Sequence, residues 1–175
     1  NLKPNRFILV HPYVDFQGNL ITHAETGPFF KIDLCNKLKW VNSKERFHHA
    51  IEIDSEQNYW VPSFIEPYSS TIQNYRNRTG LFEDAITKIS NEGKILYQKS
   101  ILEILIENDL GKHNELFNLN DPTHLNDIQP ALSDTKYWKK DDVFISLRNI
   151  NTVIHFRPSE NKVINLISGP FSMQH

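Results

Sequence analysis

The sequence predicts an all-β protein, and three observations lead to that class. Short apolar runs alternate with polar residues at a period of two, the runs are rich in Val, Ile, Phe, Tyr and Trp, and bends with Asn, Gly or Asp separate them. The composition, with 39% hydrophobic and 23% charged residues in 175, is that of a globular protein. A chain of this length can form one domain. Length and composition together exclude the disordered and fibrous classes of protein.

One pattern recurs along the chain: an alternating apolar run, a polar bend and a second apolar run. It occupies residues 13–21, 51–61, 86–97 and 152–164. Each copy predicts a β-hairpin, because Gln-Gly-Asn, Asn-Glu-Gly and Glu-Asn are sequences that tight turns prefer. Two successive hairpins make a four-stranded antiparallel unit.

Three such units can be laid out, over about residues 7–42, 48–100 and 124–168, and a further unit would start at 175. Units of this length predict the blades of a β-propeller, in which four-stranded sheets surround a central channel. Because propellers have about four to eight blades, we expect a piece of a longer chain, with the remaining blades packed on both ends. A β-sandwich of short strands is the alternative, and the regular phase of the units argues against it.

One helix interrupts the strand pattern, near residues 100–108. Ser100 and Glu103 have the spacing of a capping box, and an apolar stripe follows Ser100. By contrast, residues 66–81 have weak periodicity, and we expect a long loop there.

The charge and the cysteine count exclude several classes of partner. Lys and Arg total 19 and Asp and Glu 21, a net charge of −2, so the sequence predicts no nucleic acid as partner. No apolar stretch is long enough to span a membrane, so no membrane partner is expected either. The single Cys35 can form neither an internal disulfide nor a thiolate zinc site.

Three of the eight histidines precede the expected innermost strands of successive blades. They are His49, His124 and His175, and His11 has a comparable position in the first unit. Because innermost strands line the channel of a propeller, we expect these imidazoles to converge at one mouth of it. The remaining histidines have no such phase: His23, His113 and His155 are expected to be structural or exposed, and His48 should point to the face opposite His49.

Arg148 lies in an apolar run, residues 143–150, where we expect a strand. A charge in such a place usually needs an anionic partner. Three histidines could instead bind zinc. Beside neutral histidines and Asn126, however, a guanidinium makes a better cradle for an oxyanion, so the residues favour an anion over a metal ion.

Five segments, taken together, resemble the arylsulfate sulfotransferases, a bacterial family that needs no nucleotide sulfate donor. They are, in chain order, residues 47–60 (its first histidine segment), 100–108 (its helix), 121–128 (its His-x-Asn segment), 143–148 (its Ser-x-Arg strand) and 167–175 (the segment leading to its nucleophilic histidine). The resemblance runs in order over about residues 30–175. Ala50 and Asp127 depart from the family pattern, which puts the fine selectivity for substrates in question.

The resemblance implies a six-bladed propeller that moves a sulfuryl group from an aryl sulfate donor to a phenolic acceptor, through a sulfated histidine. In this sequence His175 would be the nucleophile, and Arg148, Asn126, His49 and His124 would hydrogen bond the sulfuryl oxygens and the leaving phenolate oxygen. Either His49 or His124 would also act as acid to the leaving phenolate and then as base to the incoming phenol. No cofactor is implied. The resemblance also implies a periplasmic or exported protein, and we expect the isolated piece to be inactive because His175 is its last residue.

Two other functions remain open on the sequence. One is a propeller that only binds or scaffolds other molecules, since the propeller fold serves many functions. The other is a metal-dependent hydrolase of sulfate or phosphate esters that uses the same histidines. Metal analysis and sensitivity to chelators separate the hydrolase from the transferase.

Overall fold

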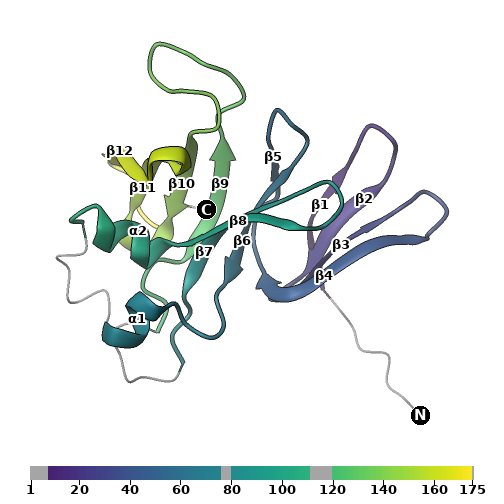
Figure 1. Ribbon diagram of the computed structural model, residues 1–175, viewed down its shortest axis with the longest axis horizontal. Helices are drawn as coiled ribbons and strands as arrows, with labels where there is room; N and C mark the ends of the chain where they lie inside the picture. Colours follow the sequence, from purple (N-terminus) through teal and green to yellow (C-terminus); the bar gives the residue numbers. More distant parts are fainter. Residues whose placement is uncertain (1–7, 76–79, 111–119, 175) are drawn as a thin grey trace.

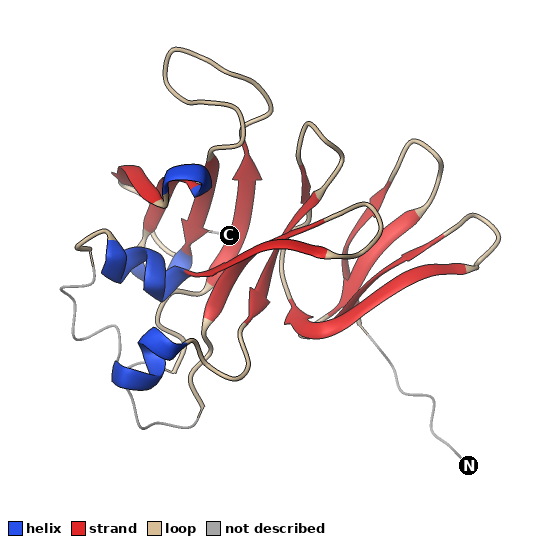
Figure 2. Cartoon of the chain, viewed as in Figure 1, coloured by secondary structure: helices blue, strands red, loops and turns tan. Residues whose placement is uncertain are grey.

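The computed structural model describes residues 8–75, 80–110 and 120–174, which form three antiparallel four-stranded units side by side (Figures 1 and 2). The first unit contains β1 (Leu9–Val14), β2 (Leu20–Ala24), β3 (Gly27–Ile32) and β4 (Leu38–Phe47). The second contains β5 (Glu52–Ile53), β6 (Tyr59–Phe64), β7 (Asp84–Ile89) and β8 (Ile95–Ser100). The third contains β9 (Leu125–Pro130), β10 (Val143–Leu147), β11 (Thr152–Arg157) and β12 (Lys162–Ser168). The predicted all-β class and all four predicted hairpins are confirmed.

The third unit is a sheet of its own, whereas the first two are joined. The third has the strand order β12-β11-β10-β9. β4 is ten residues long and continues past residue 42, so its last two residues, Arg46 and Phe47, pair with Phe64 and Ser63 of β6. This short contact makes one eight-stranded sheet out of two blades.

Four of the hairpins close with the same turn, which explains why the bends are visible in the sequence. The turns begin at Asp15, Asp33, Asp54 and Ser90, whose side-chain oxygen accepts hydrogen bonds from the backbone N–H groups two and four residues later. The fourth residue of each turn has a positive φ: Gly18, Asn36, Gln57 and Gly93. Gly93 cannot be replaced without strain, since its φ is +83° and an added Cβ would lie 2.6 Å from the Trp40 ring.

Near these turns each blade holds a buried carboxylate paired with a cation from its third strand. The pairs are Asp15 with Lys31 at 2.8 Å, Asp54 with Lys88 at 2.7 Å, and Asp142 with Arg157 at 2.7 Å. Burial alone would raise the pKa of Asp142, but hydrogen bonds from Arg157, the Lys139 backbone and His155 lower it to about 2. The same ion pair therefore recurs in three blades.

The core lies between the blades. One cluster joins the second and third blades to α2, and contains Trp60, Ile86, Ile101, Ile104, Leu105, Leu125, Ile128, Val143, Ile145, Leu147, Ile154 and Phe156. A second cluster joins the first and second blades, and contains Ile21, Phe29, Phe47, Ile51, Tyr59, Val61 and Ile89. Since each blade buries its apolar face on a neighbour, the three blades stabilise one another.

Two helices fill the long connections. α2 (Ile101–Glu107) forms as predicted, with the Ser100 hydroxyl accepting from the Glu103 N–H at 3.3 Å. The loop expected over residues 66–81 was wrong in part, because α1 (Ser70–Tyr75) lies within it. Among residues 70–73, the part of this helix whose burial the structure describes, Ile72 alone is fully buried, against Leu81 and Leu102, and one buried residue gives no apolar period. Neither helix is long and apolar enough to cross a membrane, and no other helix of the described part of the chain is.

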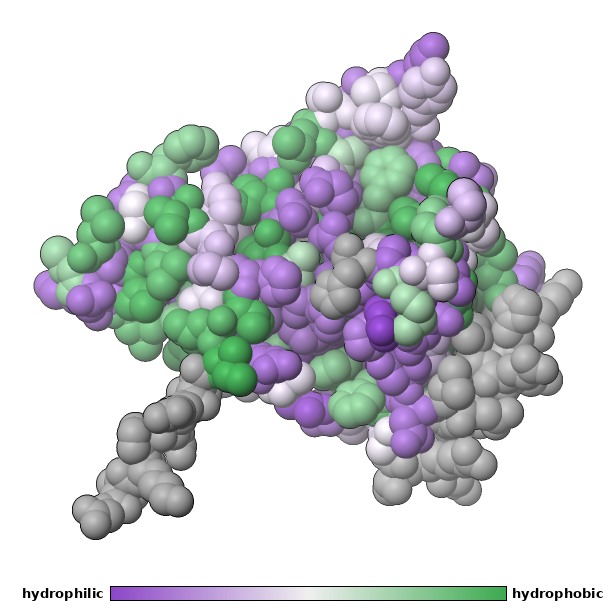
Figure 3. Space-filling model, turned by 180° about the vertical axis from the view of Figure 1, so that it is seen from behind, coloured by the Kyte–Doolittle hydropathy of each residue, from purple (hydrophilic) through white to green (hydrophobic). Residues whose placement is uncertain are grey.

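Exposed apolar side chains gather on the first blade, which the space-filling view shows on the left with a broad hydrophobic area (Figure 3). They are Ile8, Leu9, Val14, Phe16, Leu34, Leu38 and Val41, of which Phe16 is 91% exposed. An apolar area of this extent marks a surface that packs against something else.

Candidate functional site

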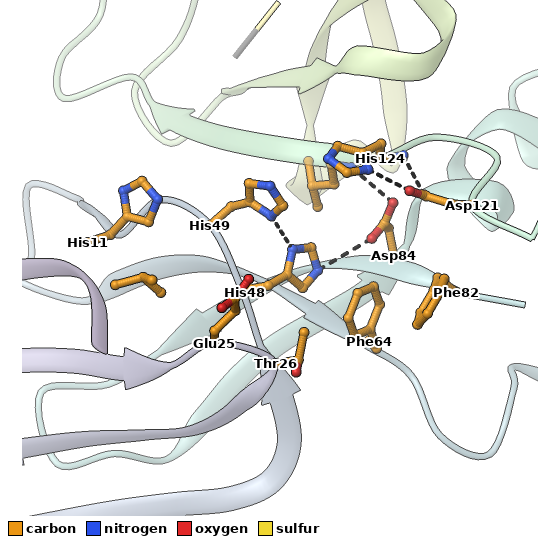
Figure 4. A pocket seen from close by; sticks show the side chains of 12 residues that line it. His11, Glu25, Thr26, His48, His49, Phe64, Phe82, Asp84, Asp121 and His124 are labelled. Atoms are coloured by element: carbon orange, nitrogen blue, oxygen red, sulfur yellow. Dashed lines mark hydrogen bonds and ion pairs between the residues drawn. The ribbon is translucent and has the colours of Figure 1, made fainter. Parts of the chain in front are cut away.

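A pocket of about 430 Å³ opens at the end of the blades opposite the four hairpin turns (Figure 4). Its walls come from β1 and from the connections β2–β3, β4–β5, β6–β7 and the one that precedes β9. The lining residues are Val10, His11, Glu25, Thr26, His48, His49, Phe64, Phe82, Asp84, Asp121, His124 and Leu125. The topology thus brings to one place residues that are more than a hundred positions apart.

His49 and His124 meet in this pocket, as their phase in the repeat predicted for two of the three histidines. Their ring centroids are 5.1 Å apart, with the rings nearly perpendicular. His11 lies in the same pocket. All three have left-handed backbone, with φ of 57° at His49, 51° at His124 and 46° at His11. Non-glycine residues adopt this conformation only where the surroundings hold them, and such positions cluster at functional sites.

Asp121 holds the His124 ring. Its Oδ2 lies 2.5 Å from His124 Nδ1, and its Oδ1 accepts from the His124 backbone N–H at 3.1 Å. A carboxylate on Nδ1 keeps the proton on that nitrogen of a neutral imidazole, and leaves the lone pair on Nε2. His124 is therefore oriented and can accept a proton.

The expectation that His48 points away from His49 was wrong. Their Nδ1 atoms are 2.7 Å apart, and both residues line the pocket. Alternation of side chains needs extended backbone, but neither residue is in a strand and the positive φ of His49 turns its side chain back toward His48. His48 stacks on Phe64 at 4.2 Å and faces Asp84 Oδ1 at 3.4 Å.

Of the other histidines, His23 and His155 are buried and structural. His23 Nε2 lies 2.8 Å from the carbonyl oxygen of His49, so it fixes the backbone at the pocket. Burial lowers the pKa of His23. His155 pairs with Asp142 near the hairpin turns. His113 lies outside the described residues.

Asn126 is buried on β9 beside the pocket. Its Nδ2 donates to the backbone oxygen of Gln174 at 2.7 Å, and its Oδ1 has no hydrogen-bond partner in the described part of the chain. Gln174 in turn donates to the carbonyl oxygens of Leu147 and Thr152. The segment before His175 is thus tied to the third blade, while His175 itself lies outside the described residues.

The prediction that Arg148 lies within a strand was wrong. Arg148 begins the 3-10 turn η2 (Arg148–Ile150), directly after β10. Its backbone N–H donates to the His124 carbonyl at 3.1 Å, which places it next to that histidine. Neither Arg148 nor Asn126 lines the pocket. The guanidinium makes no hydrogen bond or ion pair to any residue that the structure describes, so an anion from outside could bind it.

The sequence reasoning missed three supports of the site. Asp121 holds the His124 ring, Asp84 faces the His48 ring at 3.4 Å, and Asn149 donates to the Asp121 carbonyl at 2.7 Å. A carboxylate three residues before His124 was the only signal in sequence, while Asp84 is 36 positions away from the histidine that it faces, His48. In residues 8–75, 80–110 and 120–174, no three His, Cys, Asp or Glu side chains are arranged to hold a metal ion.

Two solved structures that this chain matches are longer than the chain itself. The match with the Dos1 propeller covers 96% of this chain and 36% of that one, at 11% identity and a TM-score of 0.53. It also matches a protein of unknown function from Bacteroides caccae at 10% identity and a TM-score of 0.47, over 95% of this chain and 48% of that one. The chain therefore spans half or less of each, and the likeness to the Dos1 propeller confirms the predicted propeller fold.

Comparisons of the sequence agree with the resemblance drawn from its motifs. A search among curated proteins finds no match. The family model of the arylsulfotransferases (ASST), however, matches residues 20–175, which is most of the chain. This protein therefore belongs to the arylsulfotransferase (ASST) family.

Proposed function

We propose that this protein transfers a sulfuryl group from a phenolic sulfate ester to a phenol, in two steps, through a sulfated His175. The observation that carries the proposal is the meeting of His49 and His124, 5.1 Å apart, in a pocket of a chain that belongs to the arylsulfotransferases. An imidazole that is neutral near pH 7 is a competent nucleophile, and a covalent intermediate divides one difficult transfer into two easier ones.

In the first step, a nitrogen of His175 attacks sulfur, the bond from sulfur to the phenolic oxygen breaks, and the phenolate leaves. In the second, the acceptor phenol attacks the same sulfur and the bond to His175 breaks. His49 and His124 give a proton to the leaving phenolate in the first step and take the proton of the acceptor phenol in the second. The Asp121 carboxylate on Nδ1 of His124 supports this role, because it leaves Nε2 of that ring to accept the proton.

Arg148 and Asn126 bind the sulfuryl oxygens in this proposal. Sulfuryl transfer, like phosphoryl transfer, depends mainly on alignment and on stabilising the charge that develops on oxygen. The guanidinium of Arg148 has no internal partner among the described residues, and its backbone is hydrogen bonded to His124. Asn126 is bonded to the residue that precedes His175.

Further blades of the same propeller would complete the site. The exposed apolar residues of the first blade and the partial coverage of longer chains support this part of the proposal. Export to the periplasm is also proposed, on the resemblance alone.

The test uses the full-length protein, a nitrophenyl sulfate donor and an acceptor phenol. Mass spectrometry of the peptide that contains His175 should find a sulfuryl group after incubation with the donor, and phenol should remove it. His175→Asn should abolish the label, while His155→Gln, a matched change at a buried histidine near the hairpin turns, should keep it. A folded protein that neither gains the group nor releases nitrophenolate would contradict the proposal and point to a propeller that only binds ligands.

A further inference from the structure

A buried carboxylate and a buried imidazole stand in line behind His49. Asp84 is 1% exposed and His48 is 3% exposed. Asp84 Oδ2 accepts from the Thr123 hydroxyl at 2.7 Å and from the Leu125 backbone N–H at 2.9 Å. Asp84 Oδ1 faces His48 Nε2 at 3.4 Å. A row of Asp84, His48 and His49 therefore leads from the core into the pocket (Figure 4).

Asp84 Oδ1 and His48 Nε2 face each other at 3.4 Å without the geometry of a hydrogen bond. Both atoms are buried, and neither has a hydrogen-bond partner in the part of the chain that the structure describes. A buried polar atom without a partner is costly, so the proton of a neutral His48 belongs on Nε2, toward the carboxylate. Phe64 stacks on the His48 ring and fixes its plane. His48 Nδ1 then carries a lone pair and faces the Nδ1 of His49 at 2.7 Å.

Two nitrogens at this distance share one proton. Because His48 Nδ1 is the acceptor, His49 Nδ1 is the donor, and the lone pair of the neutral His49 ring is on Nε2. The row thus assigns a tautomer to His49, and this assignment rests on the two contacts of the His48 ring, with Asp84 Oδ1 and with His49 Nδ1.

We propose that Asp84 and His48 are a proton relay that makes His49 a base for the acceptor phenol. The inference rests on the function proposed above. When the phenol attacks, its proton moves to His49 Nε2 and the Nδ1 proton of His49 moves to His48 Nδ1. The phenolic oxygen bonds to sulfur, the sulfur–nitrogen bond of the sulfated histidine breaks, and its electron pair returns to that imidazole. His48 is then an imidazolium ion beside the Asp84 carboxylate, which stabilises it.

Among the residues that the structure describes, the other titratable groups of the pocket are His11, Glu25, Asp121 and His124. Asp121 is committed to His124, and the His124 ring packs against His49 edge to face. Asp84 and His48 are positioning residues in this scheme, since they act on the phenol only through His49.

Asp84→Asn separates the relay from the structural role of Asp84. The amide oxygen can still accept from Thr123 and Leu125, so the local fold keeps its bonds. The amide N–H then points at His48 Nε2 and forces the His48 proton onto Nδ1. His49 Nδ1 becomes the acceptor and its Nε2 carries the proton, so the variant holds a donor where the wild type holds a base.

The experiment measures the two half-reactions of the full-length protein separately. With nitrophenyl sulfate the leaving group needs no proton, so the burst of nitrophenolate should fall much less in Asp84→Asn than the discharge by phenol does, and it should be the same in wild type and the control His155→Gln. Discharge of the sulfated protein by phenol should be slower in Asp84→Asn by about 10² to 10⁴-fold. With a nitrophenol that is already ionised at the assay pH, the defect should disappear. A structural defect would slow both acceptors equally.

Nitrogen NMR of labelled histidines tests the relay without any turnover. His49 should carry its proton on Nδ1 in the wild type and on Nε2 in Asp84→Asn. The same tautomer in both proteins, or equal slowing with both acceptors, overturns the relay even where His175 is sulfated. Absence of sulfation in the wild type, with the tautomers as predicted, overturns the proposed function instead. If Asp84→Asn does not fold, His48→Gln replaces it, because glutamine can hold a hydrogen bond to His49 but cannot take up its proton.

Discussion

The two ends of the blades differ in how they are built. At the end with the hairpin turns, four bends have the same hydrogen bonds, and three blades repeat the same buried ion pair. At the end with the pocket, the connections differ in length and sequence, histidines have left-handed backbone, and carboxylates hold imidazoles. The same strands run from the end with the hairpin turns to the end with the pocket.

The difference shows that the turns depend on local contacts in the chain, whereas the pocket depends on contacts between blades. Each turn is stabilised by residues within five positions, so the turn end forms from local sequence. The pocket needs His49, Asp84 and His124 from three connections, so it exists only once the blades have packed. Variants at the two ends should therefore have opposite effects.

The largest effect is expected for His49 and His124 at the pocket end, the two histidines to which the proposed function assigns proton transfer. His49→Ala and His124→Ala in the full-length protein should each lower kcat by about 10² to 10⁴-fold, because proton transfer in the transition state is lost. Neither ring belongs to the core clusters, so the free energy of unfolding should change by only about 0.5 kcal/mol. Sulfuryl transfer assays and thermal unfolding measure the two quantities. Loss of the fold in step with activity would contradict the separation.

The opposite pattern is expected for Asp142 at the turn end. Asp142→Ala leaves the Arg157 guanidinium and His155 without their carboxylate, and should lower the free energy of unfolding by about 3–5 kcal/mol. The kcat of the molecules that remain folded should be unchanged. Urea unfolding gives the stability, and an active-site titration corrects the activity for the folded fraction. A large fall in kcat at full folding would mean that the two ends are coupled.

Gly93→Ala should break a turn without touching the pocket. Its positive φ and its contact with Trp40 together should cost about 2–3 kcal/mol. Gly80→Ala is the matched control, because Gly80 has a φ of +90° but nothing within 4 Å of an added Cβ, so it should cost only about 1 kcal/mol. Equal losses in urea unfolding would show that the ring of Trp40 moves aside.

Acid should loosen the two ends in different pH ranges. The pKa of His23 is lowered in the folded state, so the unfolded state binds more protons and stability at the pocket end falls below about pH 6.5. The pKa of Asp142 is lowered to about 2, so its contribution of about 2 kcal/mol stays until about pH 5 and is lost toward pH 2. Hydrogen exchange should therefore rise first around His49 and later around the turns. The reverse order would contradict these assignments.

Residues that act locally were predicted well. The bends at Asp15, Asp54 and Ser90 indicated their hairpins, and Ser100 with Glu103 indicated α2, because each of these signals lies within one turn of chain. α1 was missed because Ile72 is the single apolar residue buried among residues 70–73, where burial is described, and one such residue gives no helical period.

The phase of the repeats also carried information about the pocket. It predicted that His49 and His124 meet, since equivalent positions of successive blades face the same channel. The role of His48 was beyond this reasoning, because one left-handed residue reverses the direction of a side chain and leaves no mark in the apolar pattern.

By itself, the sequence determined the all-β class, the hairpins, the helix cap and the identity of the family, because these depend on residues that are near in the chain or on motifs in fixed order. Only the tertiary structure decided which groups support the histidines. Asp84 reaches His48 across 36 positions, and its other oxygen is held by Thr123 of the next blade. Such contacts form where blades pack, and the packing of distant segments brings together side chains whose separation in the chain has no regular period.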